Sequence, residues 1–336
     1  MAWQGILGHD AIAERFRLAA SRNRLAGSFL FIGENGTGKR VFAVALAKTL
    51  MCKQPDAARF LPCGICASCH MFPADPVAGC LPVAHPDFFY VAKPEEKATL
   101  PLELLVGDKE HRGKSGLCFE ISRTSYLGGK KVAVIDDADF FNAETANALL
   151  KTLEEPPADS LLILLGSSAT KQLPTIRSRC QTVRFHPLSD RNLATILHAR
   201  GLVDSLEQGL RLAKRAGGSL DGAKDLMDER LEPSREELIR LLSVDKGDAA
   251  GIAARVNGFL DALAKDPPLR RRRLRFLFLA AIDYYRAELR KAETKANGER
   301  SDESFFTTRI ECTLDAIEQI DRNANLPFII DAWAGR

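Results

Sequence analysis

The sequence contains no apolar run that approaches the roughly 18 residues needed to span a bilayer, which argues against a transmembrane helix. Its opening residues, Met1–Gln4, do not begin a secretory signal, so we expect a cytoplasmic protein with no membrane partner. Thiols stay reduced in the cytoplasm. The 8 cysteines therefore need a role other than disulfide formation.

A strong net charge, internal repeats and low-complexity segments are also missing from the sequence. The net charge of +3 is too small to indicate a nucleic-acid-binding protein on charge alone. Hydrophobic residues make up 46% of the chain and charged residues 27%, which is typical of a folded globular protein and argues against disorder. With 336 residues, the chain is long enough for two or three domains with substantial cores.

A glycine-rich segment, Gly33–Arg40, lies between a predicted strand and a predicted helix. The apolar residues Phe29–Ile32 suit a buried strand, and we expect a helix from Val41 to about Leu50. A phosphate-binding loop requires this order, because backbone N–H groups and a helix N-terminus surround the phosphates while a lysine reaches the terminal ones. The candidate nucleotide-binding residues of this loop are Gly33, Gly36, Gly38 and Lys39.

The residue after the lysine departs from the phosphate-binding signature. The signature has Ser or Thr there to hold Mg²⁺, whereas this chain has Arg40. Arg40 argues against ATP hydrolysis by this chain and leaves the binding of ATP with Mg²⁺ open. In the alternative interpretation, the loop is only a tight connection from strand to helix, kept for packing.

Four cysteines have the spacing of a structural zinc site. Two consecutive C-x-x-C spacings bring three thiolates near one point, and ten residues separate them from a fourth cysteine upstream. Four thiolates leave no open position for water, so a bound zinc would hold a loop together and would not catalyse. These ligands are Cys52, Cys63, Cys66 and Cys69; the alternatives are an unmetallated surface insertion, or the replacement of one ligand by His70, Cys80 or His85.

The segment 131–180 predicts a strand–helix–strand unit. Val132–Ile135 and Leu161–Leu165 are short apolar runs, typical of strands buried on both faces of a parallel sheet. Between them, Asn142 suits a helix N-cap, and Pro156-Pro157 ends the helical pattern. Ligands of such sheets lie beyond the carboxyl ends of the strands. The polar residues that follow the two strands are Asp136, Asp137, Ser167 and Ser168.

Only helices are predicted after a last short strand near Val183. We expect a capping box, in which Ser234 begins a helix. We also expect a long helix from about Leu269 to Glu293, followed by a polar surface loop over 294–304. The arginine run 270–275 is interpreted as a solvated helix start, or as a set of partners for acidic residues of a neighbouring subunit, rather than as a DNA contact.

Several motifs together resemble those of bacterial DNA polymerase III clamp-loader subunits of the AAA+ superfamily, most closely the delta-prime type. These are the glycine-rich loop, the cysteine cluster, IDDAD, ANALLKTLEEPP and LPTIRSRC. The resemblance implies an α/β plus all-α chain: a AAA+ parallel-sheet domain over 1–187 with a zinc module at about 52–70, a helical lid over 188–230, and a C-terminal helical collar domain over 231–336.

The resemblance also implies roles for the site residues. Asp136 matches the metal-holding acid, Asp137 stands where motor subunits have a water-positioning glutamate, and Ser167 or Ser168 matches the polar residue that senses the terminal phosphate. The lid arginine of the family is replaced by Asp221. Because these changes weaken separate parts of a hydrolytic site, the resemblance implies a chain with little or no ATPase activity of its own, within a holoenzyme that polymerises DNA.

Arg179, in Ser-Arg-Cys, matches the family's arginine that reaches the nucleotide of a neighbouring subunit. A guanidinium supplied in trans stabilises charge on the transferred phosphoryl group. Arg177 ranks below it, and the alternative is that Arg179 only pairs with a carboxylate. The implied partners are gamma/tau-type and delta-type subunits, the sliding clamp and, through the assembly, primed DNA. Two rival functions remain open: an active gamma/tau-type ATPase, and a module that binds DNA directly.

Overall fold

The computed structural model describes residues 2–75, 79–94, 96–244, 248–263, 267–294, 300–321 and 324–335. The chain divides into two compact units, residues 1–223 and 224–336. The first unit contains the sheet and the second contains only helices among its described residues. The division into sheet domain, lid and collar, with boundaries at 187 and 230, stays a prediction.

The first unit is built on a five-stranded sheet in which every pair of neighbouring strands is parallel. The strand order is β2-β3-β4-β1-β5. All residues of β1, β3 and β4 are buried, as expected for apolar strands covered on both faces. The strand bounds are β1 (Ser28–Ile32), β2 (Phe88–Val91), β3 (Lys131–Ile135), β4 (Ser160–Gly166) and β5 (Gln181–Arg184).

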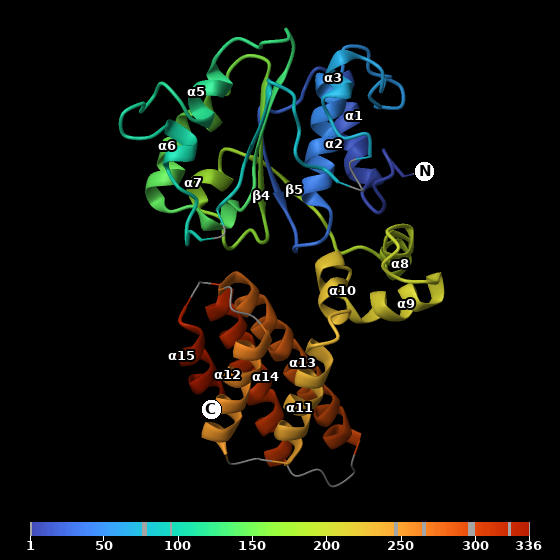
Figure 1. The fold of residues 1–336 in the computed structure, drawn as a ribbon, viewed down its shortest axis with the longest axis vertical. Coiled ribbons are helices and arrows are strands. Elements are labelled where there is room, and N and C mark those ends of the chain that lie inside the picture. Colours follow the sequence, from blue (N-terminus) through green and yellow to red (C-terminus); the bar gives the residue numbers. More distant parts are fainter. Residues whose placement is uncertain are drawn as a thin grey trace. The chain divides into compact units, whose positions relative to one another are not determined.

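Helices cover both faces of this sheet, so the first unit is a three-layer α/β structure (Figure 1). Alternate residues of one strand point to opposite faces: Phe29 and Phe31 pack with one helical layer, Leu30 and Ile32 with the other. The first layer contains α1 (Asp10–Ser21), α2 (Lys39–Met51) and the short α3 (Ala67–His70). The second contains α4 (Glu103–Val106), α5 (Leu117–Ser122), α6 (Ala143–Glu154) and α7 (Pro174–Arg177).

Three helices follow the sheet in sequence. Ser189 and Ser205 cap two of them, each accepting a hydrogen bond from a backbone N–H three residues on. The two ends of the stretch that contains the first two of these helices are joined, because Leu188 N donates to Gly218 O at 2.9 Å. The helices are α8 (Asp190–Ala199), α9 (Leu206–Arg215) and α10 (Leu220–Leu226).

The second unit is a helical bundle with its own core. Phe278 packs against Trp333 with ring centroids 4.7 Å apart, and both side chains are buried. Trp333 Nε1 donates to Thr313 Oγ1 at 2.8 Å, which satisfies the buried indole N–H. The helices are α11 (Leu231–Val244), α12 (Ala249–Leu263), α13 (Pro267–Thr294), α14 (Arg300–Asp321) and α15 (Leu326–Ala334).

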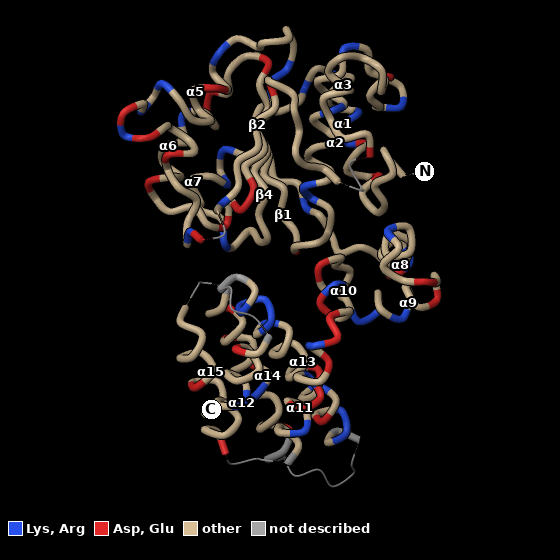
Figure 2. The backbone as a smooth tube through the Cα atoms, in the orientation of Figure 1, with Lys and Arg blue, Asp and Glu red and all other residues tan. Residues whose placement is uncertain are grey.

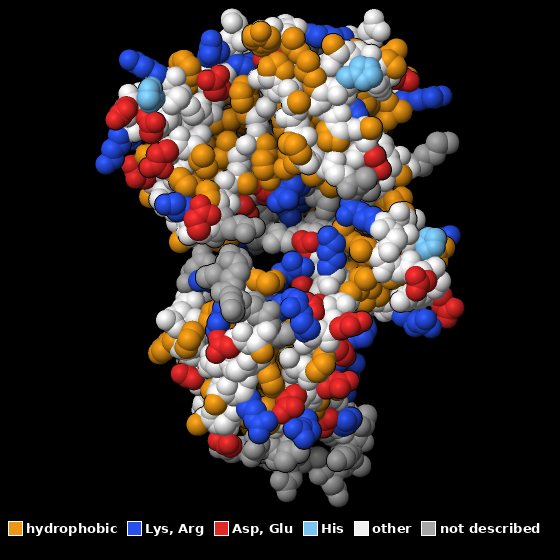
Figure 3. All heavy atoms as spheres, viewed as in Figure 1, with side chains coloured by type: hydrophobic (Ala, Val, Ile, Leu, Met, Phe, Trp, Pro, Cys, Tyr) orange, Lys and Arg blue, Asp and Glu red, His pale blue; other side chains and the backbone are white. Residues whose placement is uncertain are grey.

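Charge follows this layout. Lys, Arg, Asp and Glu lie mostly on helices and loops, whereas the strands are almost free of them (Figure 2). Both signs are interspersed on the visible surface, with hydrophobic side chains between them (Figure 3). Among the described residues, no helix is long and apolar enough to cross a membrane.

Three details of the sequence interpretation were wrong. Ser234 does not begin a helix, because α11 starts at Leu231 and the Ser234 hydroxyl donates to the carbonyl oxygen of Arg230 one turn earlier. The expected loop over 294–304 has the wrong bounds, because α13 includes Thr294 and α14 begins at Arg300; residues 295–299 lie outside the described residues.

The third concerns the arginine run on α13, which is not simply solvated. Arg272 pairs with Asp225 at 2.8 Å, and Arg273, only 5% exposed, pairs with Asp228. Arg270 pairs with Asp261 at 2.6 Å. The run therefore binds acidic residues of its own chain.

Candidate nucleotide site and cysteine cluster

The glycine-rich loop leaves β1 and enters α2 as the sequence predicts. Gly36 and Gly38 have φ of +75° and +96°, a left-handed conformation that favours glycine. A Cβ on Gly36 would lie 2.5 Å from Ser219 Oγ, because the residues that begin α10 close over the loop. Ser219 Oγ donates to Asn35 O at 2.7 Å, and Leu220 N donates to Gly36 O at 3.0 Å. The loop is thus held by a second segment of the same unit.

Lys39 points into its own loop. Its Nζ donates to Gly33 O at 2.5 Å and to Glu34 O at 2.8 Å, and the residue is only 8% exposed. Burial lowers the pKa of Lys39, while the charges of Asp136 and Asp139 act in the opposite direction. To reach a phosphate, this ammonium group must give up two carbonyl oxygens for the phosphate oxygens.

Arg40 binds the carboxylate of Asp136, which follows β3. Its Nε donates to Asp136 Oδ2 at 2.6 Å, and Tyr90 OH donates to the same oxygen at 2.8 Å. The Arg40 guanidinium also lies 5.9 Å from the centre of the Tyr90 ring. The other oxygen, Oδ1, accepts the backbone N–H of Asp137 at 2.9 Å. Both carboxylate oxygens therefore have protein partners, and the cation beside them is a guanidinium.

Asp137 lies next to this pair in a left-handed backbone conformation, with φ of +57°. Burial raises its pKa to about 6, and the negative charge of Asp136 acts in the same direction. Aspartate tolerates this backbone conformation better than most residues. The Asp137 carboxyl is therefore about half protonated near pH 6.

The two serines after β4 behave differently from each other. The backbone N–H of Ser167 donates to Asp139 Oδ2 at 2.8 Å, and the buried Gln172 side chain donates to Asp139 as well. Ser167 Oγ is buried and has no hydrogen-bond partner among the described residues. Ser168 Oγ lies 2.7 Å from Thr170 Oγ1 and is part of the loop. Ser167 is thus held through its backbone N–H, and its buried hydroxyl has no partner among the described residues.

Sequence reasoning missed several residues that shape this site. His9 Nε2 lies 2.6 Å from Thr37 O, and its ring packs against Phe185 at a centroid distance of 4.8 Å. Burial lowers the pKa of His9, so the neutral imidazole donates to the loop carbonyl. Tyr90 and Asp139 were also missed. Two signals could have indicated these residues. Tyr90 lies one residue before the end of β2, and Asp139 lies within the IDDAD motif.

Arg179 lies at the amino ends of the strands, opposite the glycine-rich loop. It comes just before β5, whereas the glycine-rich loop comes just after β1, and the two strands are parallel. Arg179 Nε donates to Glu154 Oε1 at 2.6 Å, and Nη1 donates to Thr175 O at 3.0 Å. The side chain is 30% exposed. The structure therefore brings the loop, Asp136 and Ser167 together but keeps Arg179 apart from them.

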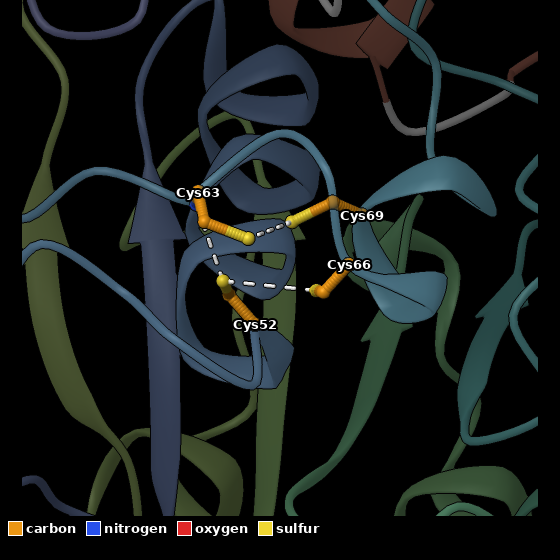
Figure 4. A group of neighbouring side chains, drawn as sticks. All are labelled: Cys52, Cys63, Cys66 and Cys69. Carbon is orange, nitrogen blue, oxygen red and sulfur yellow. Dashed lines mark hydrogen bonds between the residues drawn. The ribbon is translucent and has the colours of Figure 1, made fainter.

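The four cysteines converge as a set of metal ligands would (Figure 4). Their sulfur atoms all lie within 4.8 Å of one another, and the Cys52–Cys66 and Cys63–Cys69 pairs are each 3.9 Å apart. Tetrahedral zinc with bonds of about 2.3 Å requires sulfur atoms about 3.8 Å apart, so the geometry fits zinc.

The cysteine cluster is anchored to α2 and its own loop. Ser68 Oγ donates to Met51 O at 2.8 Å, and Lys48 Nζ donates to Pro73 O at 2.7 Å. Burial raises the pKa of the Cys69 thiol to about 12. At Cys66 burial also acts to raise the pKa, but hydrogen bonds from backbone N–H groups outweigh it and lower the pKa to about 6. A zinc bound here would fix the segment between α2 and β2.

This chain is similar to several known proteins. A family model described as DNA polymerase III, delta subunit, matches residues 8–189. The delta-prime subunit of DNA polymerase III from Pseudomonas aeruginosa is 34% identical over 65% of this chain and 61% of its own length. That from Escherichia coli is 30% identical over 66% and 61%. The chain thus spans about three fifths of the length of these relatives.

More distant likenesses lie in the same group of proteins. A gamma/tau subunit of DNA polymerase III from Mycoplasma pneumoniae is 25% identical over 71% of this chain and 32% of its own length. A gamma-subunit-related protein of known structure from Thermotoga maritima is 16% identical, with a TM-score of 0.46 over 96% of this chain and 97% of that one. Because the family model covers more than half of the sequence, this chain belongs to the DNA polymerase III delta-subunit family, as a delta-prime-like member.

Proposed function

We propose that this chain is a stator subunit of a cytoplasmic bacterial clamp loader. In this role it supplies Arg179 to the ATP site of an adjacent gamma/tau-type subunit while the assembly, with its delta-type subunit, places the sliding clamp on primed DNA. Its membership of the delta-subunit family supports this role, because relatives of both the delta-prime and gamma/tau kinds are named as DNA polymerase III subunits.

One observation carries the proposal. The glycine-rich loop lies at the carboxyl end of β1, whereas Arg179 lies at the amino end of the neighbouring parallel strand β5. A strand of five residues spans roughly 16 Å at about 3.3 Å per residue. Because that distance exceeds the reach of a side chain, Arg179 is unable to serve a nucleotide in its own loop. A phosphate that contacts this guanidinium therefore belongs to another chain.

The state of the chain's own pocket supports the same division of labour. Lys39 is bound to carbonyl oxygens of its loop, and Arg40 takes the oxygen of Asp136 that a Mg²⁺ ion would need. The Arg40 guanidinium thus supplies the positive charge beside Asp136, which disfavours the binding of a metal–nucleotide complex. A rigid subunit with no nucleotide cycle of its own suits a stator.

Arg179 is held ready by a weak and exchangeable pair. Glu154, its partner, is 48% exposed, and ion pairs of this kind contribute little stability. A neighbouring triphosphate offers more negative charge and bidentate geometry, so the guanidinium can move from the carboxylate to the phosphates at small cost. In trans, such a group typically raises the rate of phosphoryl transfer by about 10³–10⁵.

The test is reconstitution of the clamp loader with Arg179→Ala. We expect normal assembly and a loss of clamp-stimulated ATP turnover at one of the motor sites. Arg211→Ala is the matched control, because it removes an exposed arginine paired with Glu207 on α9 and should leave turnover unchanged. Unchanged turnover with Arg179→Ala, or an equal loss with Arg211→Ala, would contradict the role in trans.

The rival function is that of a gamma/tau-type ATPase, favoured by the survival of Lys39 and all three loop glycines. Brisk ATP hydrolysis by the isolated chain, abolished by Lys39→Ala, would establish it. The stator proposal instead predicts no measurable turnover by the isolated chain and no effect of Lys39→Ala.

A further inference from the structure

We propose that the outer side of β5 carries a phosphate-binding site, separate from the glycine-rich loop. A cavity of about 380 Å³ opens there, in the first unit. It is lined by Arg15, Ala169, Arg177, Thr182, Arg184 and His186. No acidic residue lines it. The comparisons with known proteins and the proposed role of Arg179 do not require such a site.

Three different elements bring these side chains together. β5 is an edge strand that pairs only with β1, so its other side is open. Val183 is buried, while Thr182 and Arg184 on either side of it are exposed, as strand alternation requires. Arg15 comes from α1, beside the buried Phe16, and Arg177 ends α7. The cluster is therefore fixed by the packing of the strand and both helices.

The three arginines have unused binding capacity. None of them forms an ion pair or a side-chain hydrogen bond among the described residues. Their neighbours differ: Arg17 binds Glu14 at 2.6 Å, and Arg179 binds Glu154. Three guanidinium groups around one cavity repel one another, and this repulsion is relieved when an anion binds between them. The arrangement thus favours an anionic ligand.

The donors suit a phosphate better than a carboxylate or a base. A guanidinium presents planar pairs of N–H donors, and three of them with the Thr182 hydroxyl offer more donors than one carboxylate accepts. A tetrahedral phosphate takes hydrogen bonds from several directions. The lining contains no aromatic residue besides the His186 imidazole, so it lacks the stacking surface that a base needs. Free phosphate species and a nucleic-acid backbone share this chemistry.

The experiment uses the full chain and two probes. Pyrophosphate binding is followed by calorimetry and by the side-chain N–H signals of arginine in NMR spectra. Binding of a fluorescein-labelled single-stranded DNA is followed by anisotropy at several salt concentrations. The variants are Arg184→Gln, Arg177→Gln and Arg184→Lys. The matched control is Arg211→Gln, which removes an exposed arginine paired with Glu207 on α9.

We expect Arg184→Gln and Arg177→Gln each to weaken binding about tenfold, as the loss of one charge-assisted contact does. Arg184→Lys should have a smaller effect, and Arg211→Gln none. Losses with both probes identify a general phosphate site, and losses with DNA alone, with a lower salt slope, identify the nucleic-acid backbone as the source. Equal behaviour of Arg184→Gln and Arg211→Gln, or selective binding of polyglutamate over both probes, overturns the proposal. Arg179→Ala should leave binding unchanged, which separates this site from the proposed role in trans.

Discussion

The guanidinium of Arg40 binds the carboxylate of Asp136, the residue that we expected from the sequence to hold a metal ion. Its partner Asp136 is 96 residues away in the sequence, and Tyr90 contributes a third group from another strand. The sequence predicted the loss of the metal-binding hydroxyl at position 40. The sequence could not predict that Arg40 would bind Asp136, because that contact depends on how β3 and α2 are placed.

Replacing Arg40 by threonine should restore part of a metal site. The change removes the competing cation from Asp136 and supplies a hydroxyl, so we expect Mg²⁺–ATP to bind at least about tenfold more tightly, a gain of about 1.4 kcal/mol. Calorimetry with and without Mg²⁺ measures it. Arg40→Lys keeps a cation near Asp136 and should show no gain. Equal affinities for the parent and Arg40→Thr would disprove this account of the pocket.

Asp137 should make the stability of the chain depend on pH. Burial and the charge of Asp136 raise its pKa to about 6, so between about pH 4 and pH 6 the folded state binds more protons than the unfolded state. Its contribution to stability is therefore greatest below pH 4 and is lost as the pH rises through 6. Asp137→Asn removes this titration and keeps a residue suited to φ > 0.

We expect Asp137→Asn to raise the free energy of unfolding by on the order of 2 kcal/mol at pH 8 and to have little effect at pH 4. Urea unfolding across this pH range measures both values. A constant difference between the two proteins over the whole range would mean that the effect arises from packing and not from the charge of Asp137.

Among the elements, the buried strands were the most predictable. The apolar runs at 132–135 and 161–165 were expected as strands and form the cores of β3 and β4. Asn142 caps its helix as expected, accepting from Thr145 N at 2.8 Å. Such features are local, because they follow from runs of apolar residues and from one side chain at a helix start.

Features that depend on tertiary packing were harder to predict. The capping motif at Ser234 is valid locally, yet α11 begins three residues earlier, at the buried Leu231. Tertiary packing decided where this helix begins. The same holds for the segment from Ser219, which lies on the glycine-rich loop although 183 residues separate Ser219 from Gly36.

The cysteine cluster should bind one zinc ion and stabilise the segment that it closes. We expect Cys63→Ser to lose the bound zinc and to lower the melting temperature of the first unit by several degrees, because ligand binding stabilises only the folded state. Metal analysis and thermal unfolding with and without a chelator measure this. Cys312→Ser, on α14, is the matched control and should keep its zinc. Parent protein that takes up no zinc would rule the site out.

At the scale of the whole molecule, the chain divides into two compact units, and each has hydrophobic clusters of its own. The first unit, residues 1–223, contains the sheet. The candidate nucleotide site lies at the carboxyl ends of the strands and Arg179 at the amino ends. The second unit, residues 224–336, contains a helical core of its own. Each unit is large enough to unfold cooperatively by itself. We therefore expect denaturation in two steps, each assigned to one unit.

Arg273 offers the sharpest test of this independence. It is buried in the second unit and binds Asp228, whose pKa is lowered by hydrogen bonds from Arg230 and from Arg273. Arg273→Ala leaves Asp228 with one partner fewer and a cavity beside it, so we expect a loss of about 2 kcal/mol in the second unit's transition alone. Arg272→Ala removes the ion pair with Asp225, in which the arginine side chain is 42% exposed. This change should lower the free energy of unfolding by less than about 1 kcal/mol.

Urea unfolding followed at two probes separates the two transitions. The fluorescence of Trp333 reports on the second unit and that of Trp3 on the first, and each tryptophan is isolated by replacing the other with phenylalanine. Arg273→Ala should move the Trp333 midpoint and leave the Trp3 midpoint in place, while Cys63→Ser should do the reverse. Both midpoints moving together in either variant would mean that the two units unfold as one. The pocket and the helical bundle could then no longer be treated as separately stable parts.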